Sequence, residues 1–341
     1  MLSYDALQFA RTFTLRRIWN ALVVWFSYHF SRSFHINKHR GYPITVSIEP
    51  TTSCNLRCPE CPSGLRSFTR PTGNLSMGTF SKIIDEVHSH TPYLILYFQG
   101  EPYLNPQFHD MVSYARSKKM YVATSTNAHY LTPENAKKVV DSKLSRLIIS
   151  LDGTTQETYQ KYRIGGDINK VIQGIQNIVQ EKQRRKVRYP HVILQFIVFK
   201  HNQHQIEEIK QLAKTWQVDE LQLKTAQVYN FEHGNELIPE NEQYRRYTQN
   251  KEGKFVIKNK LLNHCWKLWH SCVFTWDGKV LPCCFDKDAQ YEMGNIKHTS
   301  FKAIWKNTKY QQFRQQILKG RANIEMCKNC TEGTKTTLAM E

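Results

Sequence analysis

The stretch EPTTSCNLRCPEC, residues 49–61, carries Cys54, Cys58 and Cys61 at the spacing C-x3-C-x2-C. A looped backbone lets thiolates at this spacing converge on one centre, and cysteine is the usual ligand of iron–sulfur clusters. Tetrahedral zinc is the alternative, but a structural zinc site normally takes four protein ligands, and the local count stops at three cysteines. A 4Fe-4S cluster held by three cysteines leaves one iron without a protein ligand and open to a small molecule.

The segment before these cysteines is typical of a strand. Residues 42–48, YPITVSI, alternate and are rich in β-branched side chains. The cysteines therefore begin at the C-terminal end of a strand, where α/β barrels carry their chemistry. This arrangement resembles the radical S-adenosylmethionine (SAM) superfamily, in which C-x3-C-x2-C follows the first barrel strand. The resemblance implies that the three cysteines hold a 4Fe-4S cluster whose fourth iron is chelated by SAM; Glu60 stands where many members have an aromatic residue.

Composition places two metal centres in a large chain. Nine cysteines in 341 residues fall into two groups, within residues 54–61 and 265–330. A disulfide framework is typical of small secreted domains, so this pattern favours metal sites in a reducing cytoplasm. The net charge of +18 predicts attraction to nucleic acid, anionic lipid or a phosphorylated substrate, or else a solvated cationic surface. The basic run 182–188 has Tyr189 as its one neighbouring aromatic residue, which disfavours a single-stranded nucleic-acid groove.

From residue 42 onward, expected strands and helices alternate. Six strands are predicted at residues 45–48, 94–98, 121–125, 146–150, 192–198 and 220–224. Helices are predicted between them at residues 80–90, 107–118, 133–141, 168–184 and 204–216. Ser76 and Thr132 are expected N-caps. Parallel strands joined by right-handed helical crossovers give an α/β fold, and the pattern predicts the partial (βα)6 TIM-like barrel of radical SAM enzymes over residues 42–224.

A turn after the second expected strand adds to the resemblance. Gly100, Glu101 and Pro102 match the last three residues of the family's Gly-Gly-Glu-Pro turn, with Gln99 in place of the first glycine. In the family this turn binds the amino group of SAM. Glycine allows close approach of the backbone, and a carboxylate suits an ammonium group. An ordinary loop turn is the alternative.

Polar residues also follow the third and fourth expected strands. The resemblance implies that Ser150 and Arg163 meet the methionine carboxylate of SAM, because they occupy the matching positions. It also implies that Asn127 contacts the ribose region. Helix capping or surface polarity is the alternative for each residue.

The second cysteine group surrounds a predicted β-hairpin. Residues 274–280, FTWDGKV, predict two short strands around an Asp-Gly turn, and a short helix is expected at residues 304–306. Cysteines before, at the end of and after this unit resemble the SPASM/twitch extension of radical SAM enzymes, which carries auxiliary 4Fe-4S clusters. The resemblance implies one auxiliary cluster held by Cys265, Cys283, Cys327 and Cys330.

Alternatives stay open within this second group. Cys284 rivals Cys283, because neighbouring side chains on an extended chain point in opposite directions. Cys272 is expected to be a spare. A zinc site with four cysteines has a similar ligand set. A full SPASM module with two auxiliary clusters uses more cysteines than the six of this group.

The expected organisation is an N-terminal segment 1–41, the barrel 42–224, a connector or lid 225–260, and a small C-terminal β-hairpin/helix cluster-binding extension 261–341. In the first segment, apolar residues at helical spacing form one face: Leu15, Ile18, Trp19, Leu22, Trp25 and Phe26. The longest uncharged run there is 14 residues, whereas a spanning helix needs about 20. The segment therefore packs on the barrel or lies as a basic amphipathic helix on an anionic membrane.

Together these resemblances imply a radical SAM oxidoreductase. Such an enzyme cleaves SAM to a 5′-deoxyadenosyl radical, abstracts a substrate hydrogen and, with an auxiliary cluster, oxidises a small-molecule substrate. A peptide-modifying maturase is the alternative within enzymes, and a non-catalytic cluster or electron-transfer protein is the alternative outside them. The expected partners are a small-molecule or peptide substrate and an external one-electron reductant of the flavodoxin or ferredoxin type. The expected location is cytoplasmic, with peripheral contact to the inner face of the membrane as an option.

Overall fold

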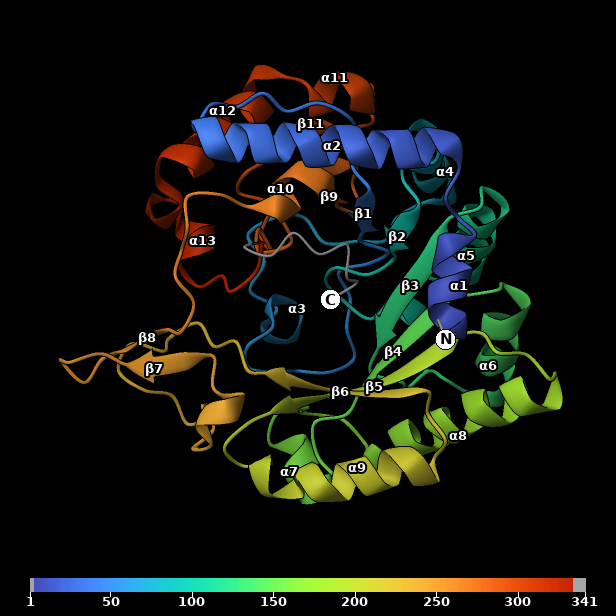
Figure 1. Cartoon of the computed structure of the whole chain (residues 1–341). Coiled ribbons are helices and arrows are strands. Elements are labelled where there is room, and N and C mark those ends of the chain that lie inside the picture. The colour runs from blue at the N-terminus through green and yellow to red at the C-terminus, as the bar shows by residue number, and fades with distance from the viewer. Residues whose placement is uncertain (1–2, 334–341) are drawn as a thin grey trace.

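The computed structural model describes residues 3–333, which form one curved sheet surrounded by helices (Figure 1). The sheet has nine strands in the order β11-β10-β9-β1-β2-β3-β4-β5-β6, and β7 pairs with β8 in a separate hairpin. The strands are β1 (Thr45–Ile48), β2 (Tyr93–Ile95), β3 (Tyr121–Thr126), β4 (Arg146–Ser150), β5 (His191–Val198), β6 (Glu220–Thr225), β7 (Tyr247–Gln249), β8 (Phe255–Ile257), β9 (Ser271–Phe274), β10 (Lys279–Leu281) and β11 (Gly294–Asn295).

Helices cover the outer face of this sheet and also make up most of the N-terminal and C-terminal parts of the described chain. The α-helices are α1 (Tyr4–Ala10), α2 (Leu15–Phe34), α3 (Pro62–Leu65), α4 (Met77–Val87), α5 (Phe108–Ser117), α6 (Pro133–Asp141), α7 (Gln156–Gln160), α8 (Ile168–Arg184), α9 (Ile206–Thr215), α10 (Trp266–His270), α11 (Phe301–Trp305), α12 (Thr308–Gly320) and α13 (Glu325–Lys328). Short 3-10 turns are η1 (Pro102–Leu104), η2 (Gln203–Gln205), η3 (Glu242–Tyr244) and η4 (Arg321–Asn323).

Strands β1 to β6 are parallel neighbours, which confirms the predicted partial α/β barrel. The crossovers carry apolar faces onto the sheet, where their side chains join the strands in one buried core. The predicted cap residues are confirmed, since the hydroxyls of Ser76 and Thr132 each accept a backbone hydrogen bond of 3.2 Å in the first turn of α4 and α6.

Several of the expected barrel elements differ at their ends, and the differences are largest in β2 and α4. Strand β2 ends at Ile95 rather than at residue 98, because the chain turns away toward Gly100, whose φ is +75°. Helix α4 begins directly after its cap, at Met77, three residues before the expected start, and it ends at Val87. Both differences concern the first or last residues of an element, and the periodicity of the sequence does not define these ends well.

The predicted C-terminal hairpin is present and joins the barrel sheet. Strands β9 and β10 pair antiparallel around a turn in which Gly278 has φ +88°. Strand β9 also runs parallel to β1, with Thr45 opposite Ser271. Strand β9, which carries Cys272, therefore lies beside the strand that precedes the first cysteine group, although about 200 residues separate the two groups in the sequence.

Helix α1 is held against the starts of the barrel strands. The Asp5 carboxylate contacts the Tyr121 hydroxyl and the Arg146 guanidinium, all buried. The Phe9 ring lies 5.7 Å from Tyr93 and 5.6 Å from Tyr121. These contacts fix the N-terminal segment to the end of the barrel opposite the cysteines.

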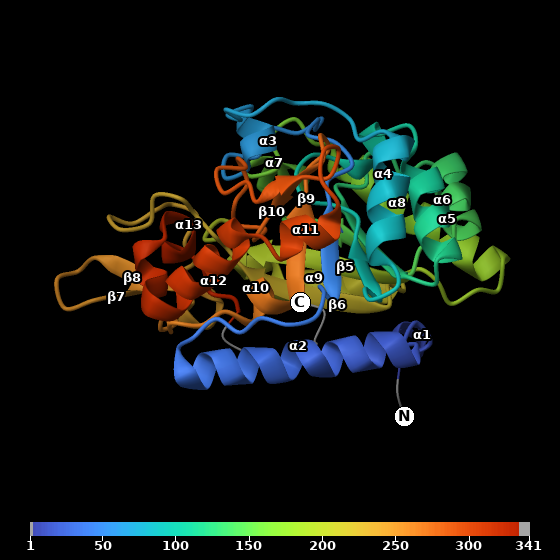
Figure 2. The same cartoon turned by 90° about the horizontal axis from the view of Figure 1, so that it is seen from above.

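Helix α2 lies across the same end of the barrel (Figure 2) and packs through its more polar face. The buried Arg17 guanidinium donates to the carbonyl oxygens of Thr12, His88, Lys118 and Lys119 at 2.6–3.2 Å. The Asn20 amide exchanges hydrogen bonds with the Tyr42 backbone. These bonds determine which face of α2 meets the protein.

The predicted apolar face of α2 is turned to solvent. Trp19 is 69% exposed and Phe26 is 63% exposed. The exposed stripe consists of Leu15, Ile18, Trp19, Leu22, Trp25, Phe26, Phe30 and Phe34. The expectation that this face packs on the barrel is therefore wrong, because the hydrogen bonds of Arg17 and Asn20 hold the opposite face inward. Within residues 3–333, no helix combines the length and apolar character needed to cross a membrane.

The segment 225–260 forms a small unit beside β6. Strands β7 and β8 pair antiparallel, with Tyr247 opposite Ile257. The Tyr247 hydroxyl donates to Val228 O and bonds to Asn329 Oδ1 at 3.0 Å. This tyrosine ties the segment to the C-terminal region that carries the last cysteines.

Candidate active site

The first three cysteines lie in the loop between β1 and α3. Cys61 is the residue before the first turn of α3, and its backbone N–H donates to Cys58 O at 3.3 Å. Burial raises the pKa of the Cys54 thiol to about 12 and also raises that of Cys58, so a bound cation has to offset the cost of a buried thiolate. The structure thus brings together the three cysteines predicted for the first cluster.

A cavity of about 240 Å³ opens beside these cysteines and collects the other predicted residues. Gly100, Glu101, Asn127, Ser150 and Arg163 all line it together with the three thiols. Pro102 is buried just behind, at the start of η1. Parallel strands bring their C-terminal ends to one edge, which explains why residues so far apart in sequence meet here.

Glu101 is held by a dense set of hydrogen bonds. Its carboxylate accepts from Thr126 Oγ1 at 2.7 Å and from the Asn127 N–H at 2.8 Å. The Gly100 turn packs so closely on the Thr51 carbonyl that a Cβ would lie 2.4 Å from it. Burial raises the pKa of Glu101 to about 7 despite these bonds. The site therefore presents a carboxylate that a nearby ammonium group would stabilise.

Arg163 is oriented by a carboxylate that sequence reasoning did not single out. Its Nε donates to Asp152 Oδ2 at 2.5 Å, and its Nη1 lies 3.9 Å from Cys58 Sγ. Asp152 in turn accepts from the Ile197 N–H at 2.8 Å, so it is anchored to β5. The signal in the sequence was the position of Asp152 two residues after Ser150, at the end of the same strand.

Asn127 bonds to a second residue missed by the sequence, Asn55. Asn127 Nδ2 donates to Asn55 Oδ1 at 2.8 Å and lies 4.0 Å from Cys54 Sγ. Asn55 sits within the C-x3-C spacing, so its position was visible but its role was not. Its contact couples the cysteine loop to the end of β3.

The second cysteine site brings together four thiols from distant segments. Cys265, Cys283, Cys327 and Cys330 line one small cavity. Burial raises the pKa of the Cys330 thiol to about 12, and the Arg321 guanidinium, whose Nη2 donates to Cys330 Sγ at 3.2 Å, opposes this shift by favouring the thiolate. Only about 20 Å³ of space lies between the side chains, so the donor set rather than an open cavity supports a cluster here.

The two other cysteines of this group lie outside that cavity. Cys272 is buried on β9, where it is in register with Val46 on the neighbouring strand β1. The thiols of Cys283 and Cys284 are free, and a hydrogen bond with Cys283 together with the charge of Lys267 lowers the pKa of Cys284. The structure thus places Cys283 rather than Cys284 among the other three thiols, as the sequence predicted, while ligation itself stays a prediction.

Within residues 3–333, no three Cys, His, Asp or Glu side chains converge as the ligands of a single metal ion do.

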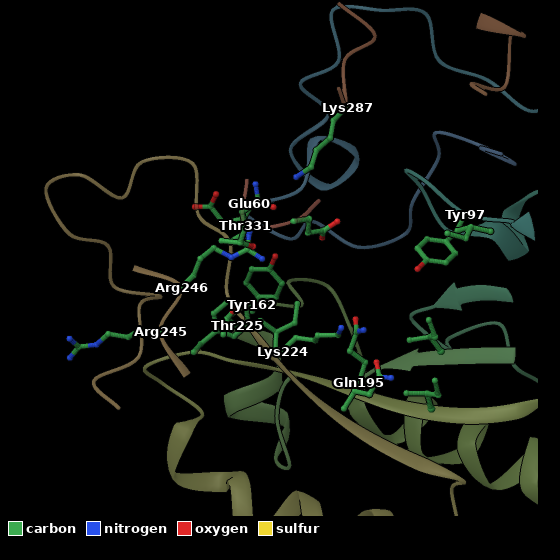
Figure 3. A pocket seen from close by; sticks show the side chains of 18 of the residues that line it. Glu60, Tyr97, Tyr162, Gln195, Lys224, Thr225, Arg245, Arg246, Lys287 and Thr331 are labelled. Carbon is green, nitrogen blue, oxygen red and sulfur yellow. The ribbon is translucent and has the colours of Figure 1, made fainter. Parts of the chain in front are cut away.

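A central cavity of about 590 Å³ lies between the two cysteine sites (Figure 3). Tyr97, Tyr162 and Ile197 line both this cavity and the first cysteine site. Glu332 lines both this cavity and the second. Glu60, at the position where the family often has an aromatic residue, also faces the central cavity and accepts a 2.8 Å hydrogen bond from the Tyr229 N–H.

Comparisons with known proteins find matches for both the barrel and the C-terminal extension. The radical SAM superfamily matches residues 48–213, and the SPASM iron–sulfur cluster-binding domain matches residues 265–331. The AdoMet-dependent heme synthase of Methanosarcina barkeri is 25% identical over 335 residues, covering 84% of this chain and 91% of that protein. The mycofactocin maturase MftC of Mycobacterium tuberculosis is 30% identical over 174 residues, covering 51% of this chain but only 42% of that protein.

A solved structure with the same fold is that of BtrN in complex with AdoMet and 2-DOIA. Its TM-score is 0.55 at 17% identity, and the match covers 89% of this chain and 98% of BtrN. At this identity the likeness concerns the fold alone. The family matches and the cysteine spacing show that the chain belongs to the radical SAM superfamily and carries a SPASM domain, with SAM and 4Fe-4S clusters as its cofactors.

Proposed function

We propose that this radical SAM enzyme is an oxidoreductase that dehydrogenates a substrate held in the central cavity. The observation that carries the proposal is the position of that cavity, which shares Tyr97, Tyr162 and Ile197 with one cysteine site and Glu332 with the other. A substrate there lies between a centre that starts radical chemistry and a centre able to accept an electron. Two-electron oxidation uses both.

In this proposal Cys54, Cys58 and Cys61 hold the SAM-binding cluster, and Cys265, Cys283, Cys327 and Cys330 hold the auxiliary one. Gly100, Glu101 and Pro102 form the turn that receives the amino group of SAM. Arg163 and Ser150 receive its carboxylate, and Asn127 lies near its ribose. The support is that the cofactor-binding residues line the cavity at the first three thiols or, for Pro102, lie just behind it.

When bound, SAM and the first cluster supply a radical that takes a hydrogen atom from the substrate, and the auxiliary cluster offers an acceptor for the second electron. The chain itself orients and shields the reactants. Asp152 holds Arg163, and the buried backbone of Asn127 holds Glu101. An external one-electron reductant of the flavodoxin or ferredoxin type completes the cycle.

Anaerobic reconstitution with iron and sulfide tests the proposal. The expected protein contains about eight irons per chain, the content of two 4Fe-4S clusters, and forms 5′-deoxyadenosine when given SAM and dithionite. The reaction is also run in D₂O, with an extract that supplies the substrate in unlabelled form. The released 5′-deoxyadenosine should then contain no deuterium, because the abstracted hydrogen comes from a carbon atom of the substrate, which does not exchange with solvent. Absence of 5′-deoxyadenosine under every reducing condition would contradict the proposal and favour a non-catalytic cluster protein.

A peptide-modifying maturase is the second candidate. This candidate is favoured by the similarity to a mycofactocin maturase, a match that spans about half of this chain. The central cavity would suit such an enzyme equally well if one residue of the peptide substrate entered it. Mass spectrometry of small peptides encoded next to the gene, incubated with the enzyme and SAM, would show a loss of two mass units or a cross-link if this candidate is right.

We also propose that the enzyme docks peripherally on an anionic membrane through α2. The exposed stripe of eight apolar residues on α2 is continuous along one helix face. Arg16 and Arg32 are exposed on the same helix, and Arg11 is exposed just before it. Lys119 is also exposed, and its carbonyl accepts a hydrogen bond from Arg17 of α2. Each basic residue near an anionic surface contributes about 1 kcal/mol, so this charge complements an anionic lipid surface and supports it as the occupant of the stripe.

Vesicle sedimentation at low salt tests this location. The full chain is expected to bind phosphatidylglycerol vesicles and to bind neutral phosphatidylcholine weakly. Trp19→Ser with Phe26→Ser should weaken binding by about tenfold or more, because each buried aromatic contributes roughly 1–2 kcal/mol. Val256→Ser with Leu262→Ser, which also removes exposed apolar residues, is the control and should have no effect. Equal losses in both double variants, or no binding to either vesicle, would refute docking through α2.

A further inference from the structure

The central cavity is lined by far more positive than negative charge. Its basic lining residues are Arg146, Lys224, Arg245, Arg246, Lys258 and Lys287. Among the described lining residues the acidic ones are Glu60 and Glu332. Such a concentration of one sign within a concave space attracts ligands of the opposite sign.

Part of this charge is already compensated. Arg146 pairs with Asp5, and Arg245 lies 3.6 Å from the carboxylate of Glu242. Glu332 is itself paired with Lys267, so its negative charge is not free to compensate the cavity. The positive charges that remain without an ion pair therefore lie on the wall formed by β6, the 225–260 segment and the loop after Cys284.

Arg246 is the most telling of these cations. Its Nε and Nη1 are buried and have no hydrogen-bond partner among the described residues. Its backbone is fixed, because Arg246 O accepts from the Lys258 N–H at 3.0 Å and the next residue, Tyr247, is anchored to Val228. A buried guanidinium with unsatisfied N–H groups, held in place by its backbone, is prepared for a planar bidentate acceptor.

Two lysines approach the same space from other segments. Lys224 on β6 forms no ion pair with the described residues, and neither does Lys287. Lys287 Nζ lies 3.0 Å from the Tyr229 hydroxyl, and its backbone carbonyl accepts from Arg70 at 3.2 Å. Figure 3 shows Arg246, Lys224 and Lys287 around one hollow, whereas Arg245 points away from it.

We propose that the substrate of this cavity carries a phosphate or diphosphate group, which Arg246 binds together with Lys224 and Lys287. These three half-buried cations form no ion pair with the described residues, and Glu60, which lies near Lys287, offsets part of their charge. The remaining charge suits a group of about two negative charges, the charge of a phosphate ester near neutral pH. A single carboxylate would leave part of it uncompensated. The inference rests on the proposed function for the identity of the cavity as the substrate site. It adds the chemical class of the substrate.

Calorimetry on the anaerobically reconstituted enzyme with SAM bound tests this inference without turnover. Inorganic pyrophosphate is expected to bind at one site per chain. Arg246→Gln and Lys287→Gln should each weaken it at least tenfold, while iron content and SAM affinity stay unchanged. Lys251→Gln, which removes a charge from the same hairpin at an exposed position, should change the affinity less than twofold.

Three results would overturn the inference. These are no binding of pyrophosphate at millimolar concentration, equal losses in Lys251→Gln and Arg246→Gln, or binding of citrate as tightly as pyrophosphate, since citrate would indicate charge without phosphate recognition. If the wild type forms 5′-deoxyadenosine yet ignores pyrophosphate, only this inference fails; if it binds pyrophosphate but never cleaves SAM, the proposed function fails instead.

Two further ligands distinguish the source of the phosphate. Farnesyl diphosphate binding more tightly than pyrophosphate would indicate a lipid-linked substrate, consistent with docking through α2. Uridine diphosphate binding more tightly would indicate a soluble nucleotide-linked substrate. Equal affinity of all three would mean that the cavity recognises the diphosphate group alone, which is the proposal in its simplest form.

Discussion

The two cysteine sites adjoin one central cavity but differ in their surroundings. The first opens into a cavity of about 240 Å³ whose wall includes Glu101, Ser150 and Arg163. The second encloses about 20 Å³, with the apolar side chains of Leu268 and Phe285 among its walls. A site with room beside the thiols admits a small charged molecule, whereas a site that encloses about 20 Å³ admits little beyond the group held by the thiols. The contrast agrees with the proposal that SAM binds at the first site.

Removing the thiols of the first site should have the largest effect. Changing Cys54, Cys58 and Cys61 to Ala together is expected to remove about four irons, the content of one 4Fe-4S cluster, and all SAM cleavage. The four thiols of the second site are untouched, so the remaining iron should stay. Iron analysis and chromatography of 5′-deoxyadenosine measure both effects. Retained cleavage would mean that the open site is not the SAM site.

The second site makes a sharper prediction about neighbouring residues. Cys283→Ala should lose the auxiliary cluster, about four irons, because Cys283 lines the cavity with the other three thiols. Cys284→Ala should keep it, since Cys284 lies outside that cavity beside Lys267. The opposite pattern of iron content in the two variants would show that the register of ligands is shifted by one residue.

Local sequence features predicted much of this architecture. The alternation of strands and helices gave β1 and β4, and also α6 and α8, at their observed bounds. The cysteine spacing and the turn at Gly100 led directly to the first site, because their chemistry depends on residues near each other in sequence. Side chains at the ends of parallel strands then had to meet.

Other features depend on contacts between distant segments. Nothing near residue 271 indicates that β9 pairs with β1, which begins 226 residues earlier. The direction of α2 is set by carbonyls of His88 and Lys118 that accept from Arg17, so a helical pattern alone gives the faces of α2 but not which one packs. The charge of the central cavity likewise arises from Arg246 and Lys287, which lie in irregular segments.

Glu101 offers a prediction specific to the open site. Burial raises its pKa to about 7 in the ligand-free protein, so below pH 7 the carboxyl is mostly protonated and binding of an ammonium must release a proton. SAM affinity is therefore expected to fall as pH drops from 8 to 6, by up to about tenfold per unit. Glu101→Gln should bind SAM more weakly at pH 8 and lose this dependence. Equal slopes for wild type and variant would show that Glu101 does not receive the amino group.

The smallest effect is expected at Cys272, the most deeply buried cysteine of the second group. Cys272 sits on β9 opposite Val46, outside both thiol cavities, and is 1% exposed. Cys272→Ala should keep all iron and all SAM cleavage and should lower the free energy of unfolding by only about 1 kcal/mol, the cost of a small cavity. Iron analysis and urea unfolding, with Cys283→Ala as the contrasting variant, measure both quantities. Loss of iron in Cys272→Ala would mean that the second site takes a cluster ligand from strand β9. The proposed set of four ligands for that site would then be wrong.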